Sequence, residues 1–543
     1  MKYIVDTLTY TNEIVNNYHV TPLMAKVIEH KNLSIQEFHK FINKRLVYHD
    51  FSLFSEAEIV LDRIHEAIEN NEKICIYGDY DCDGILATSI MVQCFHELGM
   101  SVGYHIPNRF VDGYGLNVAR VEQMAAKGYT LIITVDNGVK AYEAVERANE
   151  LGVDVIITDH HTFDEYEDLP DALSIIHTKL SPDYPYNEIC GGFIAYKLAA
   201  ALLGHHDKYL YTLAAITTVS DMMPLLDENR STVMHGLTFM EEEKFLPIDL
   251  LMGNSRTYNA STVGFTIAPK INSLGRLPEL ANPNLLVKYF LKDTNDEYRV
   301  KLAELMTKIN AKRQSLTNSQ YKMALKGLDE DVMFYGSSDL HEGIIGLIAG
   351  KYTRDYNKPA FVMHYDKDTH IYRGSCRGVE GFHIYHFLES HSDLLEAFGG
   401  HAMAGGFSVS DDHYEEFKEA LVKEIEGKTF ETILSVIPLS FEDLTIQAIE
   451  SLDLLEPFGQ DNEAPTFIFE KIKIQSKRQM SAGRHLRLEF AGRHTHFSGL
   501  YFNHGDLYDK LSEGQEVTIV GTLSINHFRN TTSIDFLIKD MLI

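Results

Sequence analysis

The sequence predicts an α/β protein in which a long helix joins two α/β lobes and a C-terminal β-barrel follows them. Three observations predict this fold class. Short apolar runs alternate with helix-period segments over about residues 55–157, the alternation returns over about 332–430, and five short strand patterns fill residues 467–537. The alternation is typical of parallel sheets covered by helices, and closely spaced short strands are typical of small barrels.

The first lobe is expected to contain apolar strands interleaved with amphipathic helices. The expected strands are 74–77, 102–106, 131–135 and 153–157, and the expected helices are 56–70, 85–98, 117–127 and 141–151. Apolar runs of this length, bounded by helical patterns, indicate strands of a parallel sheet. In such open sheets ligands bind beyond the carboxyl ends of the strands, so functional side chains are expected there.

The remaining elements complete a chain of several domains. Apolar residues from Leu302 to Leu316 recur on one helical face, which predicts the long connecting helix. A second, smaller lobe is expected to begin with a strand at 332–335, a helix at 344–352 and a strand at 360–363. The expected domains are a helical segment 1–50, a first lobe 51–290, a connecting helix 291–325, a second lobe 326–430, a connecting segment 431–464 and an OB-fold barrel 465–543.

Composition favours a protein of the reducing cytosol. The five cysteines are scattered and contain no CxxC pair, which argues against a disulfide framework and a structural zinc site. The N-terminus lacks a secretory apolar core, and the longest apolar stretch, near residues 193–203, is too short for a membrane span. We therefore expect a soluble, cytoplasmic protein.

The charge pattern contains one feature that favours nucleic-acid binding. A net charge of −29 opposes contact with phosphates as a whole, but residues 471–493 carry seven Lys and Arg against the single acid Glu489. In an OB-fold, basic and aromatic side chains hold single strands, although such a cluster can also be a solvated basic face. The residues expected to do so here are Lys477, Arg478, Arg484, Arg487, Tyr501 and Phe528.

Acidic and histidine side chains follow several expected strands. They are Asp79, Asp81 and Asp83 in GDYDCDG, Asp136 in ITVDNG, and Asp159, His160 and His161 in ITDHH. Hard oxygen ligands and imidazole at neighbouring strand ends suit a pair of divalent cations that activate water against a phosphodiester. The first triplet imitates a calcium-binding EF-hand, but the twelfth position is Ile90 rather than Glu and a strand precedes it, so that site is rejected.

Two further segments have the composition of phosphate sites. FGGHAMAGGFS, residues 398–408, offers glycine amides around His401, although a tight turn explains the same pattern equally well. Arg373, Ser375 and Arg377 form a second cluster in RGSCR, able to hold a terminal phosphate. Neither a GxxxxGK[ST] loop nor a GxSxG elbow occurs, so nothing indicates a P-loop ATPase or an α/β-hydrolase.

Taken together, these segments resemble the DHH phosphoesterase superfamily, and specifically the RecJ single-strand-specific exonucleases. The resemblance runs from about residue 50 to the end and also includes TVSDMMPLLDENR, APKINSLGR, HEGIIGLIAG and EPFGQDNEAPTF. It implies a DHH lobe and a DHHA1 lobe joined by a long helix, followed by an OB-fold. One departure is Tyr77, where related phosphoesterases outside the RecJ group often have a histidine; another is Leu340, where relatives usually have an indole.

The resemblance also implies roles for individual residues. Two Mn²⁺ or Mg²⁺ ions would be bound by Asp79, Asp81, Asp83, Asp136, His160 and Asp221, with Asp136 between them. His161 would contact the scissile phosphate, and Asp136, His160 and His161 form the catalytic set. A pocket for a 5′-phosphate would be formed by Arg109, Arg276, Ser375 and Arg377, and His341 and His401 would line the DNA path.

The function that follows is hydrolysis of single-stranded DNA from the 5′ end, releasing 5′-mononucleotides in DNA repair and recombination. We expect a monomer that acts with a helicase and a single-strand-binding protein. Two alternatives remain open at this point. One is a DHH-type phosphodiesterase of short oligonucleotides or cyclic dinucleotides, which would not need the barrel, and the other is a DNA-binding scaffold without catalysis.

Overall fold

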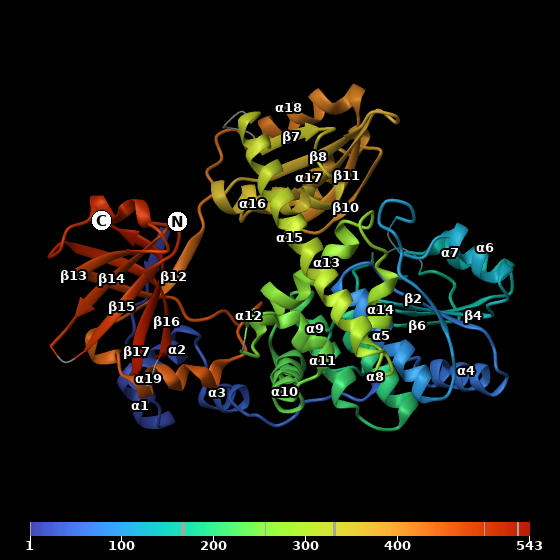
Figure 1. The fold of residues 1–543 in the computed structure, drawn as a ribbon, viewed down its shortest axis with the longest axis horizontal. Helices are drawn as coiled ribbons and strands as arrows, with labels where there is room; N and C mark the ends of the chain where they lie inside the picture. Colours follow the sequence, from blue (N-terminus) through green and yellow to red (C-terminus); the bar gives the residue numbers. More distant parts are fainter. Residues whose placement is uncertain are drawn as a thin grey trace. The chain divides into compact units, whose positions relative to one another are not determined.

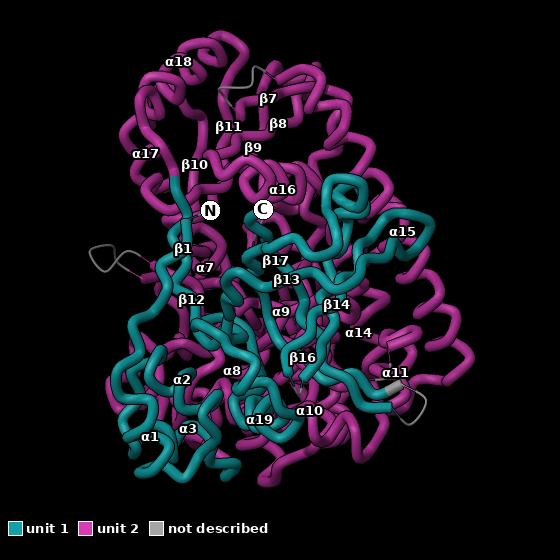
Figure 2. Tube along the Cα trace, turned by 90° about the vertical axis from the view of Figure 1, so that its left-hand side faces the viewer, with its two compact units in different colours: residues 1–45, 431–543 teal, residues 46–430 magenta. Residues whose placement is uncertain are grey.

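The computed structural model describes residues 2–113, 115–163, 169–255, 257–328, 333–493, 495–528 and 531–543, and the Phe528 side chain lies outside this description. The chain forms two compact units, residues 46–430 and residues 1–45 with 431–543 (Figure 2). The larger unit contains both α/β lobes and the helix between them. All five cysteines are buried and free. Among the described residues, no helix has the length and apolarity needed to cross a bilayer.

The first lobe is built on a five-stranded parallel sheet with the strand order β3-β2-β4-β5-β6, which confirms the predicted sheet. Figure 1 labels β2, β4 and β6 of this sheet. Its strands are β2 Ile74–Tyr77, β3 Gly103–His105, β4 Leu131–Val135, β5 Asp154–Thr158 and β6 Ser174–Ile176. Its helices are α4 Ala57–Glu69, α5 Cys82–Glu97, α6 Val118–Ala126, α7 Tyr142–Glu150, α8 Gly191–Leu203, α9 Lys208–Ser220, α10 Asp227–Glu243, α11 Leu246–Met252, α12 Ala260–Thr262, α13 Ala268–Arg276 and α14 Asn284–Phe290. A π-helical segment, Val263–Ile267, connects α12 to α13.

Burial on both faces explains why these strands are continuous apolar runs. Every residue of β2 and β4 is buried. One face packs against α4, α5 and α8, and the other packs against α6 and α7. The strand order reverses between β2 and β4, because the chain leaves β2 for β3 on one side and returns to β4 on the other. Ligands of open α/β sheets bind at such a reversal, so the carboxyl ends of β2 and β4 are the expected place for a site.

The helix α15, Asp296–Lys326, connects the two lobes and confirms the predicted long helix. At 1.5 Å per residue its 31 residues span roughly 46 Å. The side chain of Asn295 caps its first turn by accepting hydrogen bonds from the amides of Glu297 and Tyr298, at 2.9 and 3.3 Å. Its first half packs into the core of the first lobe, and its last turns pack into the second lobe through Tyr321 and Ala324.

The second lobe is a mixed five-stranded sheet of the order β10-β11-β9-β8-β7. Its strands are β7 Met333–Ser337, β8 Ala360–Asp366, β9 Ile371–Arg377, β10 Ala397–Gly400 and β11 Ala404–Ser410, and its helices are α16 Ile345–Tyr356, α17 Ile384–Ser390 and α18 Tyr414–Ile425. Only β7 and β8 run parallel; the other pairs are antiparallel. The glycine-rich segment is therefore a hairpin of β10 and β11 with His401 in its turn.

The smaller unit is a closed five-stranded barrel, as predicted, with residues from both ends of the chain packed on it. Its strands are β1 Lys2–Val5, β12 Ile433–Pro438, β13 Phe467–Met480, β14 His485–Ala491, β15 His496–Tyr501, β16 Glu516–Phe528 and β17 Thr531–Leu542; its helices are α1 Thr11–Tyr18, α2 Pro22–His30, α3 Ile35–Phe41 and α19 Ile446–Glu450. Pairing of β13 with β16 closes the barrel. Strand β1 extends the sheet by pairing in parallel with β12, and Leu23, Met24 and Val27 of α2 enter the barrel core.

A fully buried ion pair anchors the segment that leads into the first lobe. Lys197 of α8 donates hydrogen bonds to Glu228 of α10 at 2.5 Å and to the carbonyl of His49 at 2.6 Å. The Glu228 carboxylate also accepts from the Tyr184 hydroxyl at 2.7 Å and from the His49 amide at 2.6 Å. Burial lowers the pKa of Lys197 to about 8, although Glu228 opposes the shift. Removing either partner would leave the other buried without a compensating charge, which destabilises the fold.

Candidate metal centre and phosphate site

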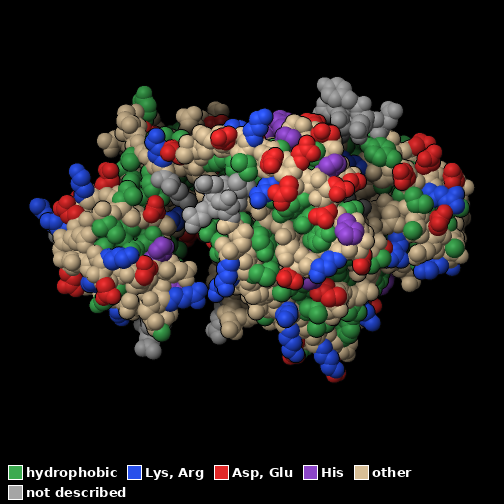
Figure 3. Space-filling view, turned by 90° about the horizontal axis from the view of Figure 1, so that it is seen from above, with side chains coloured by type: hydrophobic (Ala, Val, Ile, Leu, Met, Phe, Trp, Pro, Cys, Tyr) green, Lys and Arg blue, Asp and Glu red, His purple; other side chains and the backbone are tan. Residues whose placement is uncertain are grey.

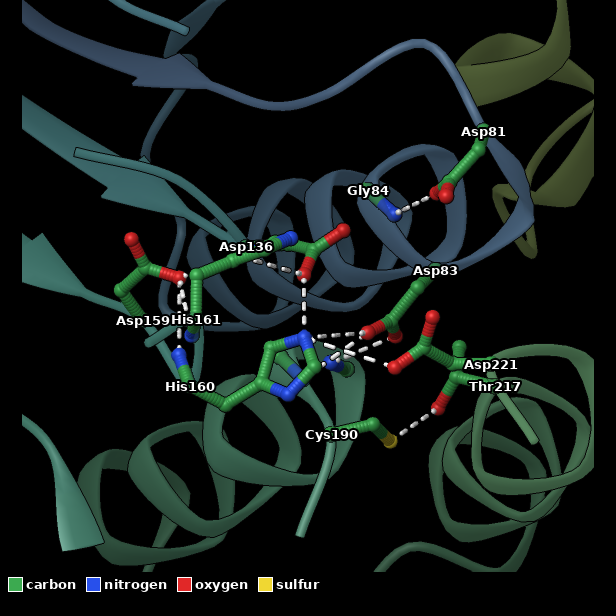
Figure 4. Close-up of polar contacts among 12 residues, drawn as sticks. Asp81, Asp83, Gly84, Asp136, Asp159, His160, His161, Cys190, Thr217 and Asp221 are labelled. Atoms are coloured by element: carbon green, nitrogen blue, oxygen red, sulfur yellow. Dashed lines mark hydrogen bonds and ion pairs between the residues drawn. The ribbon is translucent and has the colours of Figure 1, made fainter. Parts of the chain in front are cut away.

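The carboxyl ends of β2, β4 and β5, together with the C-terminal end of α9, bring the predicted ligands together. Figure 4 labels Asp81, Asp83, Asp136, His160 and Asp221 among them. Three groups have ligand atoms that all lie within 4.8 Å of one another: Asp79, Asp81 and Asp136; Asp136, His160 and His161; and Asp83, His160 and Asp221. Nε2 of His160 lies 3.1 Å from Asp136 Oδ1, 3.5 Å from Asp221 Oδ2 and 3.8 Å from Asp83 Oδ2. Asp136 and His160 each belong to two groups, so all six predicted ligands form one continuous cluster.

Local backbone structure fixes the central aspartate. Asp136 lies directly after β4 with a φ of 63°, and its amide continues the ladder by donating to the Thr158 carbonyl at 2.9 Å. The Asn137 side chain closes the turn by donating to the carbonyls of Val135 and Tyr77, at 3.0 and 3.1 Å. This turn directs the Asp136 carboxylate toward His160 in Figure 4. Tyr77 donates its hydroxyl to the Gly115 carbonyl at 3.0 Å, so this side chain is bound to the backbone.

Burial and repulsion between carboxylates characterise the cluster. Both effects raise the pKa of Asp79 to about 8 and that of Asp83 to about 6, and they raise the pKa values of Asp136 and Asp221 well above normal. Among the described residues, none hydrogen-bonds to the buried Oδ1 atoms of Asp79 and Asp136. Buried carboxylate oxygens without donors are costly unless a cation compensates them. The donor set of carboxylates and a neutral imidazole therefore fits divalent cations.

Asp159 has a different role from the other aspartates. Its Oδ1 accepts hydrogen bonds from the amides of His160 and His161, at 2.7 and 3.1 Å, and lies 2.8 Å from Nδ1 of His161. Its Oδ2 accepts from the Val139 amide at 2.9 Å. The carboxylate thus fixes the loop and the orientation of the His161 ring, as second-layer carboxylates commonly do near metals. Spacing along the sequence gave no means of separating this aspartate from the ligands.

The two adjacent histidines are in different electrostatic states. Burial and the neighbouring His161 lower the pKa of His160 to about 3, so His160 is neutral and its Nε2 is free to bind a cation. Burial opposes protonation of His161, but the Asp159 carboxylate outweighs it and raises the pKa to about 9. A protonated His161 at the edge of the cluster is a donor suited to a phosphate oxygen.

The four residues predicted to hold a 5′-phosphate line one cavity of about 240 Å³. Arg109, Arg276, Ser375 and Arg377 share this cavity with Tyr80, Asn272 and Asp81. Nη1 of Arg377 donates to Ser375 Oγ at 3.0 Å, and the Arg109 guanidinium lies 5.2 Å from the Tyr80 ring centre. Burial and the nearby Arg109, Arg313 and Arg377 lower the pKa of Arg276 to about 10, which indicates that the cavity concentrates positive charge. Arg373 lies outside it and forms ion pairs with Glu342 and Asp366.

The two remaining histidines do not line this cavity. His341 lines a neighbouring cavity of about 400 Å³ together with Phe110 and Leu340, and its Nε2 lies 3.2 Å from Glu279 of the first lobe. His401 lies in the hairpin turn of the second lobe, with Nδ1 3.4 Å from the Thr162 hydroxyl.

The structure also identifies Asn272, whose side chain accepts a hydrogen bond from the Cys82 amide at 2.7 Å and so holds the loop after β2. Asn272 lies in the APKINSLGR segment, and the resemblance of this segment to the family was the one sequence feature that pointed to it.

The barrel residues divide into exposed and structural ones. Arg478 and Arg484 are exposed, whereas Lys477 donates to the carbonyls of Tyr508 and Leu511 at 2.5 and 2.6 Å. Arg487 is paired with Glu489 at 2.7 Å. Tyr501 is only 6% exposed and packs in the barrel core, while its neighbour Phe502 is 50% exposed. Phe528 cannot be placed because its side chain lies outside the described residues.

The negative charge of the chain includes both buried and exposed carboxylates. Acidic and basic side chains are interspersed over the face drawn in Figure 3. The aspartates of the ligand cluster contribute to the charge of −29, yet Asp79, Asp83 and Asp136 are at most 3% exposed.

Comparison with known proteins gives a consistent result along the chain. Residues 73–219 match the model of the DHH family N-terminal domain, 329–427 match the DHHA1 domain, and 437–540 match the RecJ OB domain. The single-stranded-DNA-specific exonuclease RecJ of Bacillus subtilis is 33% identical over 97% of this chain and 69% of its own length. The RecJ of Escherichia coli K12 is 28% identical over 96% of each chain.

Solved structures give a similar result. The structure of RecJ in complex with Mn²⁺ from Thermus thermophilus matches with a TM-score of 0.85 and 25% identity, covering 100% of this chain and 79% of that one. The structure of the same protein with Mg²⁺ matches with a TM-score of 0.79 and 24% identity, covering 99% and 78%.

Proposed function

This chain belongs to the RecJ family, and from that premise we propose that it is a metal-dependent, single-stranded-DNA-specific exonuclease. In this proposal it hydrolyses the strand from the 5′ end and releases 5′-mononucleotides. Two divalent cations, Mn²⁺ or Mg²⁺, serve as cofactors, bound by Asp79, Asp81, Asp83, Asp136, His160 and Asp221. The relative crystallised with Mn²⁺ supports the choice of ion.

One observation supports cleavage next to a phosphorylated end of the strand. Asp81 belongs to the ligand cluster and also lines the arginine cavity, so the two sites are adjacent. A terminal phosphate held by the guanidiniums of Arg109, Arg276 and Arg377 would place the first phosphodiester next to the cluster. Fixing one end of the strand in this way favours cleavage at a constant distance from that end, because positioning removes much of the entropic cost of reaction.

Each group of the chain has a chemical task in this scheme. Bound cations would supply Lewis acidity for activating water and for neutralising charge on the phosphate oxygens. His161, oriented by Asp159 and protonated, would donate a hydrogen bond to an oxygen of the scissile phosphate. His401 and His341 of the second lobe would contact the strand. The barrel would hold the following nucleotides through exposed Arg478, Arg484 and Phe502.

Duplex DNA has to be separated into single strands before such an enzyme can digest it. The proposal therefore includes cooperation with a helicase and a single-strand-binding protein.

The decisive experiment is digestion of single-stranded DNA labelled separately at the 5′ and the 3′ end, with Mn²⁺, with Mg²⁺ and with a chelator. We expect immediate release of the 5′ label as a mononucleotide, late release of the 3′ label and no release with the chelator. Early release of the 3′ label would refute the polarity, and full activity with the chelator would refute the metal requirement.

Removing one guanidinium of the cavity should weaken recognition of the 5′ end. For Arg377→Ala we expect the preference for a 5′-phosphate over a 5′-hydroxyl, measured as a ratio of kcat/KM values, to fall about 10- to 100-fold. The reason is that a charge-assisted hydrogen bond contributes about 1.5–3 kcal/mol. Arg354→Ala, at a side chain that is 73% exposed on α16, is the matched control and should keep the wild-type ratio. An unchanged ratio in Arg377→Ala would contradict the phosphate assignment.

A further inference from the structure

The N-terminus of α8 is capped by a residue from elsewhere in the lobe. Cys190, its N-cap residue, makes no side-chain capping hydrogen bond. Instead, the Gly191 amide donates to Asp83 Oδ2 at 2.9 Å, and the Gly192 amide donates to Asp83 Oδ1 at 2.8 Å. Asp83 therefore satisfies two amides of a 13-residue helix and is also one of the predicted cation ligands.

These two hydrogen bonds leave Asp83 able to bind a cation. An ionised carboxylate has about four lone-pair sites, and the amides occupy one on each oxygen. The remaining sites are available on the side of His160, whose Nε2 lies 3.8 Å from Asp83 Oδ2.

The absence of a β-carbon at both positions allows this approach. A Cβ on Gly191 would lie 2.5 Å from the Cβ of Asp136 and 2.6 Å from its Oδ1. A Cβ on Gly192 would lie 2.5 Å from Thr217 and 2.8 Å from Asp83 Oδ1. Real Cβ contacts are not this short, so a larger residue would have to displace these neighbours. Figure 4 shows Asp83, Asp136 and Thr217 around this end of the helix.

We propose that Gly191 and Gly192 are positioning residues of the metal centre. Their amides fix the carboxylate of Asp83, and their bare Cα atoms let the end of α8 pack directly against Asp136. The pair thus sets the distance between two ligands from different elements, Asp83 in the first turn of α5 and Asp136 directly after β4. This inference rests on the proposed function, because it assumes that the cluster binds cations.

The test measures cation binding apart from activity. For Gly191→Ala and Gly192→Ala we expect the Kd for Mn²⁺, measured by electron paramagnetic resonance of the free ion, to rise about 10- to 100-fold, as for other residues that orient metal ligands. The KM for single-stranded DNA should stay near the wild-type value while kcat falls. Alanine is the better helix former, so weaker binding cannot result from loss of helix propensity.

Two control variants separate positioning from packing. Ala201→Gly weakens the same helix at an exposed position, so it should keep the wild-type Kd and shows what helix destabilisation alone does. Thr217→Ala alone should also keep the wild-type Kd. In Gly192→Ala/Thr217→Ala the overlap with Thr217 is relieved but the overlap with Asp83 remains, so the Kd should stay raised.

The outcomes separate this inference from the proposed function. If the wild-type protein binds no Mn²⁺, the proposed function fails. If the wild-type protein binds Mn²⁺ and the glycine variants bind it equally well, the positioning role is overturned. Melting of the metal-free proteins, followed by circular dichroism, reports whether each variant folds. Should Gly191→Ala lose its fold, the double variant decides alone: a raised Kd supports the role and a restored Kd overturns it.

Discussion

The variant Asp136→Ala is expected to lose about three orders of magnitude in kcat on single-stranded DNA. Asp136 belongs to two of the three ligand groups, so its removal affects both expected cation positions. Lewis-acid stabilisation of a phosphoryl transition state amounts to several kcal/mol, and about 4 kcal/mol corresponds to roughly a thousandfold in rate. Single-turnover hydrolysis with saturating Mn²⁺ measures this loss directly.

The same variant should not lose stability. Burial and repulsion by four neighbouring carboxylates, those of Asp83, Asp81, Asp221 and Asp79, raise the pKa of Asp136 well above normal. The Asp136 carboxylate therefore lowers the folding stability of the metal-free protein. Its removal relieves that repulsion, and we expect the metal-free variant to melt at or above the wild-type temperature. Asp62→Ala, which removes an exposed carboxylate on α4, should leave both rate and melting temperature unchanged. Wild-type activity in Asp136→Ala would rule out the two-cation scheme.

The second large effect is expected for stability, at the buried pair of Lys197 and Glu228. Lys197→Ala leaves Glu228 fully buried without its cation, which costs about 3–5 kcal/mol of folding free energy. Denaturant unfolding of the metal-free protein measures the loss. Tyrosine fluorescence can follow it, because the chain has no tryptophan and Tyr48 and Tyr184 flank the pair.

Two further variants define what this result means. Lys208→Ala breaks an exposed pair with Glu243 and should leave the unfolding midpoint unchanged. Lys197→Met/Glu228→Leu removes both charges and should recover only part of the loss. Apolar side chains can replace a buried ion pair, but here Tyr184 and the His49 amide lose their acceptor and the His49 carbonyl loses its donor. A midpoint for Lys197→Ala equal to that of Lys208→Ala would show that Glu228 finds another partner or becomes protonated without cost.

The fold was predictable where strands are buried on both faces. The expected strands 74–77 and 131–135 coincide with β2 and β4, because a completely buried strand leaves a short, continuous apolar run. Strand β1 was not predicted: it has four mostly exposed residues, and its partner β12 is more than 400 residues away. Its pairing depends on a contact between distant segments, which local patterns do not record.

The set of ligands was predictable from the sequence, but the structural roles of the residues around them were not. Strand ends bring Asp79, Asp136 and His160 to one edge of the sheet, and the topology alone implies this. The orienting role of Asp159 depends on which way one side chain turns after β5, and Lys477 is bound to two carbonyls of a neighbouring loop. The donors at Gly191 and Gly192 are backbone amides, which every residue except proline has. Residue types therefore could not reveal their contact with Asp83.

The pairing of β1 with β12 has a consequence for the order in which the protein is completed during synthesis. Residues 1–45 leave the ribosome before residues 431–543, which form the barrel on which they pack. Apolar side chains of α2, such as Leu23 and Val27, therefore lack the barrel core as a packing partner while about 400 further residues are synthesised. At roughly 5–20 residues per second this interval lasts tens of seconds, a time in which a chaperone could shield this segment.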